Sequence, residues 1–234
     1  MKNWIAIAVL GLSLFGPSAI MAETLAFNYA KGAEYSYKYT RQDSSTAVAP
    51  VISPKKDSDN QTYDIKIKTV DIQDDAFILD IKSGKTTIRR YVASNGAIKG
   101  TPTEDFSEIP FLPVLPTDDW RIGSSVTQKS TATAFGKQIP INWTLTLEKI
   151  DKDRGLAEIS FSTQYSLDSD RQYSRNMIQK GKIVFDMIEG VIHKADWSSL
   201  YKANMVNKEL AITRNLWSFE KQTNHSLSMT GVEK

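Results

Sequence analysis

Histidine and cysteine set the first limits on the chemistry of this chain. His193 and His225 are its only histidines, and it has no cysteine. A metal site of several imidazoles or thiolates is therefore excluded, and zinc sites of carboxylates alone are rare. His193 shares a predicted strand face with Ala195 and Trp197, so we interpret it as a hydrogen-bonded core histidine, with a catalytic base as the alternative. His225 lies in a C-terminal tail that we predict to be frayed, and we give it no role.

Carboxylates are the other candidates for catalysis, because two carboxyl groups set across a glycosidic bond can hydrolyse it. Asp186, between Phe185 and Met187, is the most notable acid. Strand alternation can place it opposite the apolar face, so we interpret it as a solvated carboxylate. The chain has no Gly-x-Ser-x-Gly elbow, no glycine-rich phosphate loop and no dinucleotide fingerprint. We therefore expect no catalytic residue, no metal and no cofactor.

The charge balance bears on the partners of the protein. The 29 lysines and arginines against 27 acidic residues give a net charge of +2, and the basic residues are scattered in pairs. Nucleic-acid binding requires a clustered basic excess, so we expect neither nucleic acid nor nucleotide as a partner. Without cysteine there are no disulfides, and burial of apolar surface has to hold the fold together.

The first residues have the pattern of a secretory signal peptide. Lys2 precedes an apolar run over residues 4–15, which Gly16 and Pro17 end. This run is shorter than the ~20 apolar residues that a membrane-spanning helix needs. We expect cleavage after Ala22, leaving Glu23 as the new N-terminus of a periplasmic or secreted protein. An uncleaved membrane anchor is the alternative.

The rest of the chain is dominated by apolar residues at every second position, which is typical of half-buried strands. Residues 35–39, 63–67, 77–81, 143–147 and 159–165 all show this alternation. We therefore predict an all-β fold, a large curved antiparallel sheet or partly open barrel of about ten to twelve strands. Residues 23–234 form one predicted domain, with a possible repeat of halves 23–100 and 116–220.

Four segments depart from this pattern. Residues 41–60 are rich in Ser, Asp, Pro and Lys and predict a surface loop, whereas residues 168–180 predict a helical turn. The tail from residue 224 is expected to fray. Four prolines in residues 101–119 predict a crossover between the halves, because proline interrupts a strand ladder. Its apolar residues either plug the sheet or form a lip over a cavity: Phe111, Leu112, Val114 and Leu115.

Residues at turns and strand starts also carry a resemblance that spans most of the predicted mature chain. They are Leu25, Phe27, Gly32, Tyr35, Tyr37, Leu112, Pro113, Leu115, Pro116, Trp120, Gly123, Gly181, Ile183, Phe185, Asp186, Gly190 and Ile192. In this pattern the chain resembles uncharacterised secreted bacterial β-rich proteins of domain-of-unknown-function type. The resemblance implies the β-rich fold and export, and it assigns no catalytic residue.

From these observations we predict an exported, noncatalytic envelope protein that binds a ligand on a curved sheet. The ligand would be apolar or amphipathic, such as a lipid, and an envelope protein is the other candidate partner. The predicted ligand-binding residues are Phe111, Leu112, Val114, Leu115, Trp143 and Trp197. The alternatives are a carbohydrate-active hydrolase that uses carboxylates such as Asp186, and a structural or adaptor protein whose apolar face is simply core.

Overall fold

The computed structural model describes residues 22–49, 52–99, 114–134, 137–166, 173–206 and 215–234. Over these residues the chain is all-β, and eleven strands form one antiparallel sheet in the order β6-β5-β4-β3-β2-β13-β12-β11-β10-β9-β8. The strands are β1 (Ala22–Glu23), β2 (Glu34–Ala49), β3 (Ile52–Gln73), β4 (Ala76–Ser83), β5 (Thr86–Ala93), β6 (Ile98–Lys99), β7 (Trp120–Arg121), β8 (Ser125–Ala134), β9 (Lys137–Asp151), β10 (Leu156–Ser166), β11 (Tyr173–Asp186), β12 (Val191–Val206) and β13 (Asn215–Glu233).

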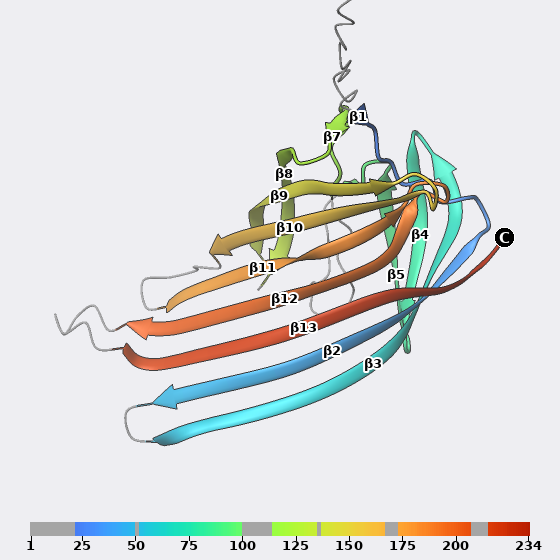
Figure 1. Cartoon of the computed structure of the whole chain (residues 1–234). Helices are drawn as coiled ribbons and strands as arrows, with labels where there is room; N and C mark the ends of the chain where they lie inside the picture. The colour runs from blue at the N-terminus through green and yellow to red at the C-terminus, as the bar shows by residue number, and fades with distance from the viewer. Residues whose placement is uncertain (1–21, 50–51, 100–113, 135–136, 167–172, 207–214) are drawn as a thin grey trace, which may run out of the picture.

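The predicted large, curved antiparallel sheet is confirmed. The sheet bends strongly and stays open, with β6 and β8 at its two edges (Figure 1). Strands β1 and β7 pair separately as a two-stranded sheet. No helix in the described part of the chain is long and apolar enough to cross a membrane.

One face of the sheet, which we call the inner face, carries the hydrophobic core. Tyr35, Tyr37 and Tyr39 of β2 are buried, while the residues between them are exposed or half-buried. The same alternation on β9 buries Leu145 and Leu147. Because successive side chains of a strand point to opposite faces, the period of two in the sequence becomes one dry face and one wet face.

The segment before β2 covers one end of the inner face. The Phe27 ring packs edge-on against Phe185 of β11 at 5.3 Å, and the Tyr29 ring packs against Phe77 of β4 at 5.5 Å. Gly190 has a φ of 66°, and a Cβ atom there would lie 2.5 Å from Asn28 Cβ, so the close approach of this segment requires glycine. We call this the packed end. At the other end, long strands project beyond the segment (Figure 1), and we call that the open end.

The prediction of a surface loop over residues 41–60 is wrong. Strands β2 and β3 form a long hairpin there, with Asp43 opposite Asp59 and Ser44 opposite Ser58, and only residues 50–51 lie outside the described residues. These strands extend into the open end, where neither face is fully covered. Without burial, selection for alternating apolar residues is absent, so the sequence has the composition of a loop.

Two further expectations are also wrong. Residues 173–180 belong to β11, not to a helical turn, and residues 167–172 lie outside the described residues. The predicted frayed tail is the central strand β13, which pairs with both β2 and β12. Its inner positions include the polar residues Thr223 and His225, so the apolar alternation of a central strand is missing. The repeat of two halves stays a prediction.

Candidate functional site

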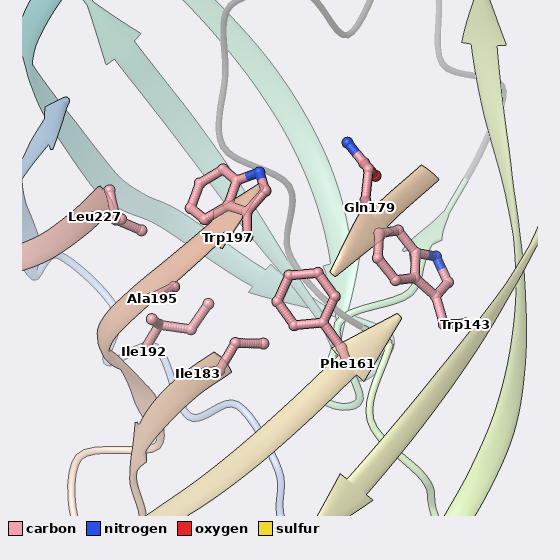
Figure 2. A pocket seen from close by; sticks show the side chains of 8 residues that line it. All are labelled: Trp143, Phe161, Gln179, Ile183, Ile192, Ala195, Trp197 and Leu227. Carbon is pink, nitrogen blue, oxygen red and sulfur yellow. The ribbon is translucent and has the colours of Figure 1, made fainter. Parts of the chain in front are cut away.

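A pocket opens on the inner face between β9 and β13. It holds about 430 Å³ of empty space, counted out to the solvent at its mouth. Two tryptophans stand on opposite sides of it, and a phenylalanine lies between them (Figure 2). The residues that line this inner pocket are Trp143, Phe161, Gln179, Ile183, Ile192, Ala195, Trp197 and Leu227. Its wall is therefore apolar except for one amide, which is the kind of lining that small-molecule sites have.

A glycine explains why the face is hollow here. Gly181 of β11 is the cross-strand partner of both Phe161 and Trp197, so the position between these two rings has no side chain. A Cβ atom at Gly181 would lie 2.4 Å from the carbonyl oxygen of Asp196 and 2.4 Å from Trp197 Cβ. Strand β12 thus approaches too closely for any other residue, which is a common reason for glycine within a strand.

A row of aromatic rings leads away from the pocket across four strands. The Trp197 ring stacks on His225 at 4.6 Å, His225 on Tyr39 at 6.0 Å, and Tyr39 on Tyr63 at 6.1 Å. The planes are within about 21° of parallel. These centroid distances are in the range of favourable aromatic contacts, so the rings pack against one another and form a wall beside the pocket.

His225 is held in this row by hydrogen bonds at both ring nitrogens. Its Nδ1 lies 2.7 Å from the Tyr39 hydroxyl, and its Nε2 lies 3.0 Å from Ser199 Oγ. Gln179 Nε2 donates to the same Ser199 Oγ at 3.1 Å, which links the row to the pocket wall. Burial, followed by the positive charge of Arg41, lowers the pKa of His225 to about 4. The imidazole is therefore neutral at pH 7.

The contact between Ser199 and His225 has the distance of a nucleophile and its base. The third partner, however, is the Tyr39 hydroxyl and not a carboxylate. Ser199 is buried in the middle of β12, a strand paired on both sides, so its backbone N–H belongs to a strand ladder. The backbone of Ser199 cannot then supply an oxyanion hole. We interpret the series of hydrogen bonds that links Tyr39, His225, Ser199 and Gln179 as structural: it fixes the orientation of these side chains.

Beyond the aromatic row lies a cluster of three charged side chains and one hydroxyl, the ion-pair cluster, made of Arg41, Asp43, Lys221 and Thr223. Arg41 Nε and Nη2 donate to Asp43 Oδ2 at 2.8 and 2.5 Å, and Lys221 Nζ lies 2.9 Å from the same oxygen. Thr223 Oγ1 donates to Asp43 Oδ1 at 2.7 Å. Burial alone would raise the pKa of Asp43, but these hydrogen bonds hold it well below its ordinary value.

The strand register places the cluster and the pocket on the same face. Asp43 is opposite Thr223, Thr223 is opposite Ser199, and Ser199 is opposite Gln179. Directly opposed residues share a face of the sheet. A polar row thus runs from the ion-pair cluster to the mouth of the pocket, beside the apolar floor. Such a surface is suited to a ligand with one apolar and one polar end.

The predicted ligand-binding residues have different positions in the structure. Trp143 and Trp197 both line the inner pocket. Leu115 and Val114 are buried, with Leu115 in the core cluster, and neither lines this pocket. Phe111 and Leu112 lie outside the described residues. Whether any of the six binds a ligand stays a prediction, as does cleavage between Ala22 and Glu23, which form β1.

The interpretation of His193 as a core histidine is wrong, because the register shifts beside it. Val184 is opposite Lys194, but the next residue, Phe185, is opposite Ile192. This bulge leaves His193 without a partner on β11 and turns Ile192 inward, so His193 is exposed. Asp186 has a turn role, since its Oδ1 accepts the backbone N–H groups of Ile188 and Glu189, both at 2.9 Å.

His225 and the ion-pair cluster were missed from the sequence, because their partners come from strands far apart in the chain. Nothing in the spacing of residues 41, 43, 221 and 225 signals that β2 pairs with β13. Within the described ranges, no three histidine or acidic side chains are grouped as a metal site.

Comparison with known proteins finds no matching family model and no matching curated protein. Among solved structures, two matches have TM-scores below 0.5. One is lipovitellin, from a study of its lipid–protein interactions, with a TM-score of 0.43 and 9% identity over 88% of this chain. The chain spans only 26% of the lipovitellin chain. The other is the secretin-domain β-barrel of InvG from a Salmonella injectisome, with a TM-score of 0.17 and 8% identity, covering 86% of this chain and 63% of that one.

Proposed function

We propose that this protein is exported and binds a single-chain amphiphile, with the apolar chain of the ligand in the inner pocket. The observation that carries the proposal is the pocket itself, which is apolar and opens on the inner face beside a row of polar side chains. Small-molecule sites are typically concave and mostly apolar, with a few polar groups that orient the ligand. The leader over residues 1–22 supports export, because it has the pattern of a signal peptide.

The pocket residues offer the contacts that an alkyl chain requires. Phe161 and Trp197 are half-buried although they belong to the inner face, and both pack against the hydrophobic core. Each methylene that the ligand removes from water contributes about 0.8 kcal/mol. The aromatic walls are fixed by stacking and hydrogen bonds, so little ordering accompanies binding.

A pocket-filling variant tests this proposal. Ala195 lines the pocket between Ile183 and Leu227, its partners on β11 and β13. Ala195→Leu should displace about two methylenes of ligand and weaken decanol binding about tenfold by calorimetry. Ala203→Leu is the matched control, because Ala203 is a buried residue of the same strand that does not line the pocket. Equal affinity of wild type and Ala195→Leu for decanol would contradict the proposal.

The hydrolase alternative gains no support from the carboxylates of the inner face. Asp43 and Asp59 are cross-strand partners, but Asp43 is held ionised by three side-chain donors. A general acid must be protonated at its working pH, so Asp43 is unsuited to that role. We therefore propose a binding function alone.

A further inference from the structure

We propose that the ion-pair cluster recognises an anionic headgroup, a carboxylate or a phosphate, on the amphiphile whose chain fills the inner pocket. This inference rests on the proposed function. It goes further by naming the chemical class of the polar end and the residues that select it, Arg41 and Lys221.

The charges of the cluster do not cancel. Two cations share the single carboxylate of Asp43, which leaves a net charge of +1. A guanidinium has five N–H donors and an ammonium has three. Arg41 uses two donors on Asp43 and Lys221 uses one, so donors remain on both for a second acceptor. Carboxylates and phosphates are the acceptors that match a guanidinium fork best.

The cluster is also more sheltered from water than other ion pairs of the sheet. The side chains of Arg41 and Lys221 are 22% and 31% exposed. In the pairs of Lys66 with Glu34 and Arg89 with Asp80, the cation is 50% and 52% exposed. Interactions with a partly desolvated cation are screened less by solvent and salt than those at the surface. An anion placed here would be held more firmly than at an ordinary surface lysine.

The position of the cluster fits the end of a chain that lies in the pocket. Arg41 is the cross-strand partner of His225, and His225 is the partner of Trp197 in the pocket wall. The headgroup would thus lie two strands away from Trp197, or about 10 Å at a spacing of about 5 Å per strand. A single net charge is too little for a polyanion such as nucleic acid, which supports a small headgroup.

One neighbouring acid opposes the binding of an anion. Asp59 of β3 is the cross-strand partner of Asp43 on the side away from the pocket. It is exposed, and Gln61 Nε2 donates to its carboxylate at 2.5 Å. Solvent screens an exposed charge strongly, so Asp59 weakens the field at Arg41 far less than Asp43 does. It serves as a control for the variants below.

The test compares three ten-carbon probes on the full-length mature protein: decanoate, decyl phosphate and decanol. Arg41→Gln and Lys221→Gln should each weaken binding of both anions about tenfold and leave decanol binding unchanged. Arg41→Lys should restore part of the loss, because it keeps the charge without the fork. Asp43→Asn removes the shared anion and should strengthen binding of both anions, whereas Asp59→Asn should have a much smaller effect. A preference of wild type for decyl phosphate over decanoate identifies a phosphate headgroup, and the reverse identifies a carboxylate.

The outcomes separate this inference from the proposed function. If wild type binds all three probes equally, or if Arg41→Gln and Lys221→Gln weaken decanol as much as the anions, the headgroup inference is wrong while the pocket stands. If no probe binds, or if Ala195→Leu changes the affinity for none of the probes, the proposed function is wrong, and the headgroup inference that rests on it is wrong as well. Circular dichroism and thermal melting establish that each variant is folded, and a misfolded Arg41→Gln leaves Lys221→Gln as the deciding variant.

Discussion

His225 makes the stability of this protein depend on pH between about 4 and 6.5. Burial, followed by the charge of Arg41, lowers the pKa of His225 from 6.5 to about 4 in the folded chain. Between these values the unfolded state binds more protons than the folded state, so stability falls as pH falls from 6.5 to 4. The full difference would be at most about 3.4 kcal/mol. His225 is only partly buried, so we expect about 1.5–2 kcal/mol after screening by solvent.

The assay is urea unfolding of wild type and His225→Phe at pH 7 and pH 4.5. Phenylalanine keeps the ring in the stack but loses both hydrogen bonds, so the variant should be less stable than wild type at pH 7. The gap should narrow at pH 4.5, because the variant has no imidazole to protonate. His193→Gln, at an exposed position, is the control and should keep the wild-type profile. An equal gap at both pH values would refute the reasoning.

Three other expectations follow from the packing and the leader. Gly181→Val should destabilise the protein by about 2 kcal/mol or more in urea unfolding, because a side chain there meets the backbone of β12; an unchanged midpoint would contradict the close approach. Phe27→Ala should cost about 3–5 kcal/mol, since the Phe27 ring joins the N-terminal segment to β11, whereas a loss under 1 kcal/mol would show that this segment is not part of the core. Mass spectrometry of the protein exported from a bacterial host should find Glu23 at the N-terminus, and an intact Met1 would contradict cleavage.

The strands were predictable from the sequence wherever burial imposes alternation. Tyr35 to Tyr39 and Leu145 to Leu147 lie on the inner face of a sheet, and their spacing shows it directly. The tip of the β2–β3 hairpin was not predictable, because its polar residues pair through the backbone while water reaches both faces. Strand β13 was missed for a related reason, since its inner positions are polar at Thr223 and His225.

The site was only half predictable. Trp143 and Trp197 were candidates because large aromatic residues on an amphipathic strand mark either a core or a binding face. The ion-pair cluster needs β2 and β13 side by side, a pairing between the two ends of the chain that no local pattern encodes. The exposure of His193 depends on a single bulge, and one extra residue reverses every side chain that follows.

The central claim, that an alkyl chain occupies the inner pocket, is tested most directly by fluorescence quenching with bromine-labelled decanol. Bromine quenches only a tryptophan that it approaches closely, and Trp143 and Trp197 stand on opposite sides of the pocket (Figure 2). We expect saturable quenching of the wild type that is largely lost in the variant with both Trp143→Phe and Trp197→Phe, while Trp120→Phe retains it. Quenching that persists unchanged without these two tryptophans would show that the chain binds elsewhere.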